Sequence, residues 1–197
     1  MARKTRVTPA GVALWPRLTT PDTKFNKDGV YQVKLELAYN DEGVEDLIKY
    51  IDGQMDESFA LAQKDNPDKK VKAADKPYQD SETEGVVRIN FKSKAKGTRS
   101  DGTEWEFHPA LFDAKGTPIK ASQVMIGSGS LIKVSFTPFQ FYTAMIGAGV
   151  SLRVQAVQIL KLEEYGGRAQ DHGFGAEDGY DSAEPEKEPW DEGAEAL

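Results

Sequence analysis

The chain has 197 residues, no cysteine and a formal net charge of −7. Its length fits one domain of about 150–170 residues followed by a tail, and the absence of cysteine excludes disulfides, thiol nucleophiles and thiolate zinc sites. No run of about 18 apolar residues exists that could cross a membrane as a helix, and no apolar segment follows the basic amino terminus as in a secretory signal. We therefore expect a cytoplasmic protein without a membrane partner.

Alternating apolar residues predict the first strand over residues 30–37. Over residues 41–63 the apolar residues recur at helical spacing, which predicts one amphipathic helix with Asn40 or Asp41 as its N-cap. The apolar residues form one stripe along this helix. We expect the stripe to pack on the core rather than to form a groove for a partner. The stripe consists of Val44, Leu47, Ile48, Ile51, Met55, Phe59 and Ala62. Residues 66–78, with two prolines and several lysines, predict a loop.

The remainder of the body predicts further strands. Val87, Ile89 and Phe91 alternate with polar residues over 86–94. Asp101-Gly102 marks a hairpin turn, and residues 103–108 supply the returning strand. Turns at 113–116 and 127–130 precede strands at 131–137 and 150–162. Short strands, tight turns and one inserted helix predict a mainly β fold, an OB-fold-like antiparallel β-barrel.

Negative charge is concentrated at the carboxyl end. Residues 171–197 contain ten acidic residues and one lysine, a net charge of −9, so residues 1–170 carry +2 of the total of −7. We therefore expect a folded domain over residues 1–170 and an acidic, disordered tail over residues 171–197. Such a tail can imitate a polyanion and compete with it, so the acidity of the whole chain does not exclude a nucleic-acid partner.

Several cations lie on or beside the hairpin between residues 86 and 108. Arg88, Lys92 and Lys94 share the strand face opposite to the apolar one. A row of cations along a strand suits the phosphate backbone of a nucleic acid, although an ordinary solvated strand face explains the pattern equally well. The cations of this set are Arg88, Lys92, Lys94, Lys96 and Arg99.

Three aromatic residues follow Pro138 within four positions. Phe139 and Phe141 share parity in an extended segment whereas Tyr142 points away from them, so the three rings cannot all enter one core. Exposed rings beside cations suit single strands, because every unpaired base has a π-face. The alternative is that one phenylalanine closes the end of the barrel. Trp15 and Tyr78 are weaker stacking candidates.

Signals for catalysis and for metal binding are weak. His108 and His172 are the only histidines, and no nucleophile motif lies near His108. The Gly-Ser-Gly-Ser sequence at residues 127–130 lacks the lysine of a phosphate-binding loop. We expect a protein that is not an enzyme and holds no metal or cofactor. The carboxylates that could hold Mg²⁺ in a nuclease are Glu104, Glu106 and Asp113, but pairing with neighbouring lysines is simpler for the first two.

The chain resembles the single-stranded DNA-binding proteins of tailed phages, a family with one OB-fold and an acidic carboxyl tail. The similarity runs in order through most of residues 7–167. The motifs that carry it are DGVYQVKL at 28–35, FDAKG at 112–116, IGSGSLIKV at 126–134, TAMIGAGVSL at 143–152 and LKLEEYGG at 160–167.

The resemblance implies a protein that coats unwound DNA in phage replication and recombination. It also implies stacking at Phe139 and Phe141 and phosphate contacts around Arg88 and Lys92. This chain departs from the family in two places. Asp28 stands where the family often has a basic residue, with Lys27 as a substitute. The chain also ends on Leu197 rather than on an aromatic residue.

We expect single-stranded DNA binding without strong sequence preference. The phosphate contacts are expected from the cations at 88–99 together with Lys133 and Arg153, and the stacking from Trp105, Phe139, Phe141 and Tyr142.

The tail is expected to cover the cationic groove until DNA displaces it, and then to bind polymerase, helicase or primase. Its partner-binding residues are predicted to be Glu186, Glu188, Trp190, Asp191, Glu192 and Leu197. A protein–protein adaptor and a Mg²⁺-dependent nuclease are the alternative functions, and both a monomer and a homodimer are compatible with the sequence.

Overall fold

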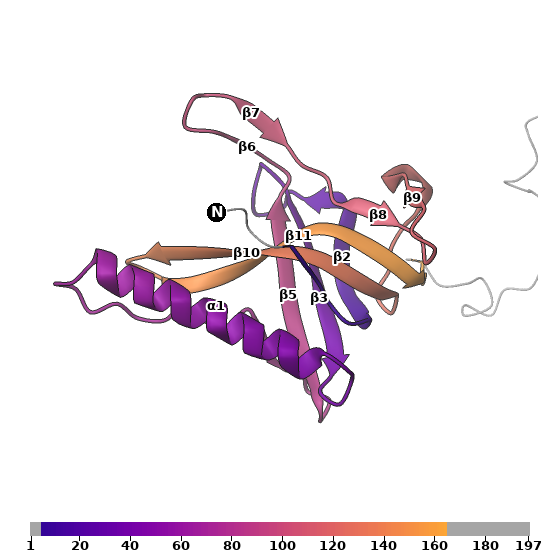
Figure 1. The fold of residues 1–197 in the computed structure, drawn as a ribbon. Helices are drawn as coiled ribbons and strands as arrows, with labels where there is room; N and C mark the ends of the chain where they lie inside the picture. The colour runs from indigo at the N-terminus through magenta and orange to yellow at the C-terminus, as the bar shows by residue number, and fades with distance from the viewer. Residues whose placement is uncertain (1–4, 165–197) are drawn as a thin grey trace, which may run out of the picture. The chain divides into compact units, whose positions relative to one another are not determined.

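Five long strands form a closed ring in the computed structural model, which describes residues 5–164 (Figure 1). They are β2 (Gly11–Asp22), β3 (Val30–Ala38), β5 (Val86–Lys94), β10 (Leu131–Thr143) and β11 (Gly147–Lys161). The order is β10-β2-β3-β5-β11, and β10 pairs with both β2 and β11. The pairings are antiparallel except that of β5 with β11, which is parallel. The expected mainly β fold with one inserted helix is confirmed.

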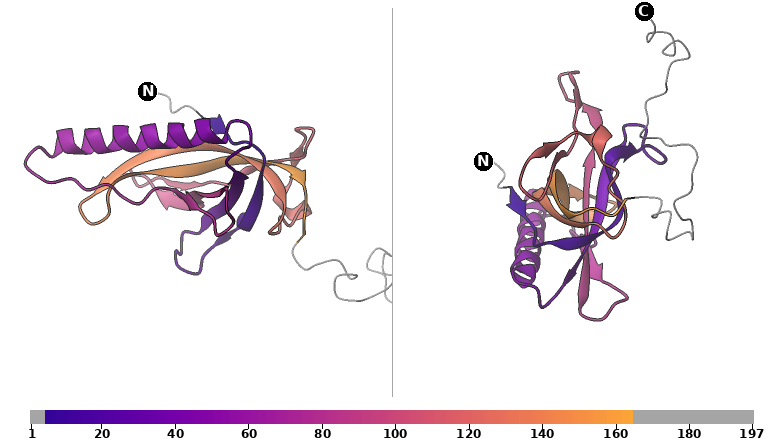
Figure 2. Two further views of the ribbon diagram at one scale, coloured as in Figure 1. Left: turned by 90° about the horizontal axis from the view of Figure 1, so that it is seen from below. Right: turned by 90° about the vertical axis from the view of Figure 1, so that its right-hand side faces the viewer.

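Shorter strands extend this ring. β1 (Arg6–Val7) pairs with β10, β4 (Tyr78–Asp80) with β5, and β8 (Ala110–Phe112) with β11, while β9 (Pro118–Ile119) pairs with β8. A short 3-10 helix, η1, covers Ala121–Gln123. β6 (Lys96–Thr98) and β7 (Glu104–Glu106) form a separate hairpin that stands away from the ring (Figures 1 and 2). The turn expected at Asp101-Gly102 joins these two strands. It is closed by a hydrogen bond in which Gly102 N donates to Arg99 O at 3.0 Å.

The inserted helix, α1 (Val44–Asp65), runs beside the β10–β11 hairpin (Figure 2). The prediction of Asn40 or Asp41 as the N-cap is wrong, since the N-cap of α1 is Gly43, which makes no side-chain capping hydrogen bond. Asp41 lies in the preceding turn, where its backbone carbonyl accepts from Val44 N. Phe59 is also misassigned, since its side chain is exposed and Ser58 is buried instead. The Ser58 hydroxyl donates to Gly149 O at 2.9 Å, which fixes α1 against β11. No helix within residues 5–164 is long and apolar enough to cross a membrane.

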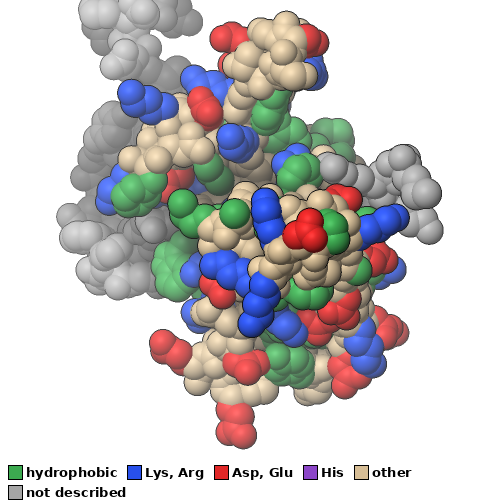
Figure 3. Space-filling view, turned by 90° about the vertical axis from the view of Figure 1, so that its left-hand side faces the viewer, with side chains coloured by type: hydrophobic (Ala, Val, Ile, Leu, Met, Phe, Trp, Pro, Cys, Tyr) green, Lys and Arg blue, Asp and Glu red, His purple; other side chains and the backbone are tan. Residues whose placement is uncertain are grey.

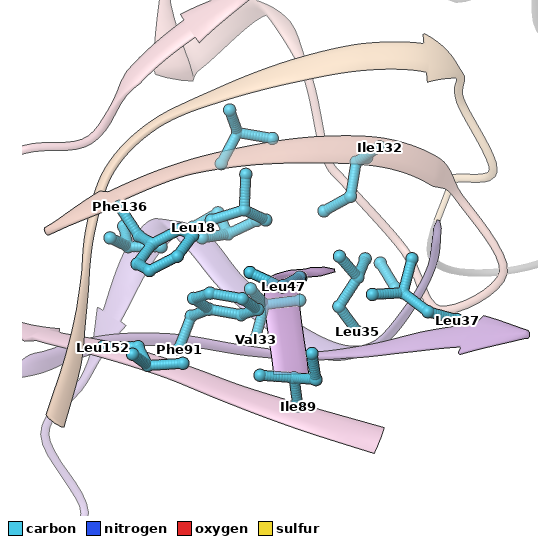
Figure 4. Packing of buried hydrophobic residues seen from close by; sticks show 14 of the residues in the cluster. Leu18, Val33, Leu35, Leu37, Leu47, Ile89, Phe91, Ile132, Phe136 and Leu152 are labelled. Atoms are coloured by element: carbon cyan, nitrogen blue, oxygen red, sulfur yellow. The ribbon is translucent and has the colours of Figure 1, made fainter. Parts of the chain in front are cut away.

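The core lies inside the ring and under α1 (Figure 4). Phe91 and Phe136 meet at its centre, with ring centroids 5.2 Å apart. The buried side chains on the five strands alternate with outward-facing ones, as a strand requires. Because the side chains on one face of each strand are buried in the core, the side chains of opposite parity point to the outer surface.

The tip of the β10–β11 hairpin is attached to the loop that follows α1. Ala148 N donates to Lys72 O at 2.9 Å, and Ala74 N donates to Ala148 O at 2.7 Å. Gly147 allows this contact because it has a φ of +106°, and a Cβ at this position would overlap the backbone at Lys72. The expected boundary at residue 170 and the tail 171–197 lie outside the described residues and stay predictions.

We predict that Gly147→Ala destabilises the protein more than Gly102→Ala. Both glycines have positive φ, but no atom lies within 4 Å of a Cβ at Gly102. Gly102→Ala should therefore cost only the backbone strain, about 1–2 kcal/mol, whereas Gly147→Ala should also detach the loop at Lys72 from the hairpin. The free energies of unfolding come from urea denaturation. Equal losses in the two variants would contradict this role of Gly147.

Candidate functional site

Two neighbouring hollows share part of their lining, and together they are called the groove. We call them the first hollow, of about 610 Å³, and the second hollow, of about 730 Å³. Lys92, Phe141 and Ser151 line both of them. The first hollow lies on β3 and β5 and reaches Trp15 and the loop at Lys76. The second lies between β5, the β6–β7 hairpin, β10 and β11.

The second hollow brings together seven of the residues that the sequence predicts to contact DNA. Its cations outnumber its single acidic residue, Glu106, so the surface is electropositive. Half-buried aromatic rings lie among these cations. The seven predicted residues are Lys92, Lys94, Arg99, Trp105, Phe139, Phe141 and Arg153.

The register of β10 with β11 explains why Phe139 and Arg153 meet. Phe136 is buried, so Phe139, three residues later, points outward; on β11, Leu152 is buried and Arg153 points outward. Thr137 lies opposite Arg153 and Phe139 lies opposite Ser151, so the two side chains are diagonal neighbours. The Arg153 guanidinium carbon lies 3.5 Å from the centre of the Phe139 ring, a cation–π contact.

The β6–β7 hairpin carries Trp105 and Arg99 to the second hollow. The Trp105 ring lies on Gly97, its partner across the hairpin, and a Cβ there would be 2.9 Å from the ring. The base of the hairpin is held by buried Tyr31, whose hydroxyl lies 2.6 Å from His108 Nδ1. Burial raises the pKa of Tyr31, which keeps the phenol neutral.

Arg88 lies outside the lining of both hollows and is already paired. Its Nη2 donates to Glu36 Oε1 at 2.7 Å, with Ser81 Oγ as a second acceptor at 3.3 Å. The hydrogen bond from Arg88 holds the pKa of Glu36 below its usual value. Arg88 therefore already has an acidic partner, whereas Lys92 and Lys94 are exposed on the same strand.

Three other predicted residues also lie outside both hollows. Lys96 is exposed on the hairpin, opposite Glu106. Lys133 is half-buried on β10, opposite Gln158. Tyr142 packs against the small apolar cluster of Ala62, Val71 and Ala148 beside α1. Its parity differs from that of Phe139 and Phe141, as predicted, and directs its ring toward this cluster.

The structure also reveals two exposed rings that the sequence analysis ranked low or omitted. Trp15 is 56% exposed and lines the first hollow. Phe25 is 89% exposed in the turn between β2 and β3, with Lys24 Nζ 5.3 Å from the centre of its ring. An aromatic residue inside the polar, lysine-bearing turn at residues 23–27 was the signal that could have identified Phe25.

A basic end of the molecule adjoins the first hollow. The segment at the end of α1 and in the following loop carries exposed Lys64, Lys69, Lys70 and Lys72. Figure 3 looks at the side where α1 ends and β10 turns into β11, and Lys and Arg side chains gather near the centre of this view. The loop continues into residues 74–77, which line the first hollow.

The carboxylates considered for a nuclease do not converge. Asp113 Oδ1 accepts from Lys115 N and Thr117 N, both at 2.8 Å, so it stabilises its own turn. Glu104 and Glu106 lie opposite Thr98 and Lys96 on the separate hairpin. Within residues 5–164, no group of three His, Asp or Glu side chains is arranged as a metal site.

Comparisons with known proteins agree with the resemblance that the motifs indicate. Residues 12–162 match the family described as single-stranded DNA-binding protein, bacteriophage T7. The single-stranded DNA-binding protein of Enterobacteria phage T3 is 28% identical over 160 residues, which cover 74% of this chain and 68% of that protein. Its counterpart from Escherichia phage T7 is 26% identical over 189 residues, which cover 85% of this chain and 80% of that protein.

Solved structures show the same fold. The crystal structure of gp2.5, a single-stranded DNA-binding protein encoded by bacteriophage T7, superposes with a TM-score of 0.75 at 24% identity, over 92% of this chain and 100% of that one. The single-stranded DNA-binding protein of bacteriophage Enc34 in complex with single-stranded DNA superposes with a TM-score of 0.59 at 13% identity, over 83% and 89% of the two chains. The family expected from the sequence is confirmed: the chain belongs to the single-stranded DNA-binding protein family of bacteriophage T7.

Proposed function

We propose that this protein binds single-stranded DNA in the groove formed by the two hollows and coats unwound strands during phage replication, in the cytoplasm of the host cell. The observation that carries the proposal is the gathering of rings and cations from β5, the β6–β7 hairpin, β10 and β11 in the second hollow. The family is one of binding proteins, and the chain is accordingly a binding protein rather than an enzyme.

Cations along the groove neutralise the phosphates of the strand. Lys92, Lys94, Arg99 and Arg153 surround the second hollow, and Lys34 lies in the first. Each phosphate contact releases condensed counterions, so affinity should fall steeply as salt rises. The exposed lysines at residues 64–72 extend the positive surface beyond the first hollow.

Rings in the groove stack on the bases. Phe139 and Phe141 are half-buried on β10, so each ring is supported by the sheet and still reachable from the groove. Trp105 faces them from the hairpin side of the second hollow. Stacking uses the π-face that every base has, and phosphate contacts carry no sequence information, so we expect little sequence preference.

We predict that replacing Phe139 and Phe141 together with alanine weakens single-stranded DNA binding by about tenfold or more, since stacking contributes roughly 1–3 kcal/mol per base. The measurement is a gel shift with a labelled 20-nucleotide oligo-dT and with a duplex of the same length, with Mg²⁺ and with chelator. Phe59→Ala is the matched control, because Phe59 is exposed on α1 and lines neither hollow.

Each outcome of this gel shift identifies one function. Preferential binding of the single strand, weakened by the double variant and not by the control, supports the proposal. No binding at low salt would favour the protein–protein adaptor, and loss of the labelled strand only in Mg²⁺ would favour the nuclease.

The acidic tail is proposed to occupy the same groove when DNA is absent. Residues 171–197 carry −9, whereas the rest of the chain carries +2, so attraction between them competes with DNA. When DNA displaces the tail, the released residues recruit polymerase, helicase or primase. The proposed recruiting residues are Glu186, Glu188, Trp190, Asp191, Glu192 and Leu197.

We predict that deletion of residues 171–197 tightens DNA binding at low salt and abolishes recruitment of replication proteins. A control chain keeps the tail length but replaces its ten acidic residues with Asn or Gln. Anisotropy of a labelled oligonucleotide measures affinity, and sedimentation of both variants tests whether a homodimer forms. If deletion and neutralisation leave both the affinity and the recruitment unchanged, the proposed role of the tail is wrong.

A further inference from the structure

We propose that Trp15 is a separate stacking platform that holds one base of the bound strand at the far end of the first hollow. This inference rests on the proposed single-stranded DNA binding and adds the course of the strand. DNA would run from Trp105 and Phe139 in the second hollow, past Lys92 and Phe141, to Trp15 in the first.

The position of Trp15 is unusual for a tryptophan. Its side chain is 56% exposed, although tryptophan is among the more buried residue types on average. It forms part of the lining of the first hollow together with Gln32, Lys34 and Lys92, whose side chains project from β3 and β5. An exposed indole beside cations in a groove offers a base both a π-face and nearby charge for its phosphate.

The backbone holds Trp15 in this position at an energetic cost. Trp15 has a φ of +46° and is the only non-glycine residue within the described range with positive φ. The β2–β3 pairing shifts register between Leu14 and Arg17, so β2 bulges at this residue. Trp15 N donates to Ser128 Oγ at 2.9 Å, which fixes the bulge. Strained conformations of this kind cluster at functional sites, where the surrounding structure holds them in place.

Two cationic side chains of the sheet make cation–π contacts with the Trp15 indole. Lys34 Nζ lies 5.3 Å and Arg88 Cζ 5.6 Å from the centre of the ring. The ion pair with Glu36, at 2.7 Å, holds Arg88 in place. The role of Arg88 in this arrangement is to position Trp15 rather than to bind a phosphate. Because more than half of the Trp15 side chain remains exposed, the ring can still receive a base.

An independent feature of the first hollow also points to a ligand. Asn90, on β5 opposite Lys34, belongs to the lining of this hollow. Its Oδ1 is the only buried side-chain nitrogen or oxygen in residues 5–164 that lacks a hydrogen-bond partner. Buried polar atoms are nearly always paired, so an orphan of this kind calls for an explanation. An N–H group of a base that enters the hollow, which each of the four bases carries, would supply the missing donor.

The fluorescence of Trp15 tests the proposal directly. The chain has three tryptophans, Trp15, Trp105 and Trp190. Replacing the last two with phenylalanine leaves Trp15 as the only reporter, and a matched chain with Trp15→Phe and Trp190→Phe leaves Trp105. Each chain is titrated with a 20-nucleotide oligo-dT. We expect the emission of Trp15 to be quenched over the same DNA concentrations that produce the gel shift.

Affinity supplies the second readout. Trp15→Leu should weaken binding of the same oligonucleotide by about 5- to 150-fold, the loss expected for one stacked base, while Trp15→Phe should keep most of the affinity. Thermal unfolding is measured for both variants, because equal midpoints separate lost stacking from a lost fold. Ser128→Ala, which removes the anchor of the bulge, should weaken binding less than Trp15→Leu does.

The outcomes separate this inference from the proposed function. If DNA binds and quenches Trp105 while the emission of Trp15 and the affinity of the Trp15→Leu chain stay unchanged, the Trp15 platform is wrong and the DNA-binding function stands. If the unmodified protein fails to bind the oligonucleotide at low salt, the proposed function itself fails.

Discussion

The antiparallel pairing of β10 with β11 is the interaction on which the rest of the structure depends. It closes the ring, because β10 also pairs with β2. The same register directs Phe136 and Leu152 into the core and places Phe139 and Arg153 on the outer surface. A slip of one residue would exchange the two faces of a strand. The packing that stabilises the fold therefore also specifies the groove, and neither can change without the other.

The charge of the chain is organised around that groove. Acidic residues are scarce in its lining, with Asp75 in the first hollow and Glu106 in the second, while lysines and arginines occur in both. Glu36, which is paired with Arg88, belongs to the lining of neither hollow. The net negative charge of the chain comes from residues 171–197, which carry −9, whereas residues 1–170 carry +2. An acidic protein can therefore present a positive binding surface, because the two charges occupy different parts of the sequence.

Sequence periodicity was sufficient where a single strand or helix decides the outcome. The alternation over residues 30–37 and 86–94 predicted which side of each strand is buried, and parity predicted that Tyr142 points away from Phe139 and Phe141. Periodicity did not predict positions that are set by a contact with a residue far away in the sequence. Arg88 is held by Glu36 on another strand, and Ser58 is buried because its hydroxyl reaches the Gly149 carbonyl. Trp15 was ranked low because its bulge depends on Ser128, more than a hundred residues later in the sequence.

The salt dependence of DNA binding tests most directly whether charge and stacking share one groove. Affinity for a single-stranded oligonucleotide is measured over a series of salt concentrations for the unmodified chain, Lys92→Gln and Phe139→Ala. Lys92 is exposed and lines both hollows, so its loss should flatten the plot of log affinity against log salt by about one unit. Phe139→Ala should lower affinity at every salt concentration and leave the slope unchanged. An affinity that does not depend on salt, or slopes that are identical in all three chains, would contradict the account.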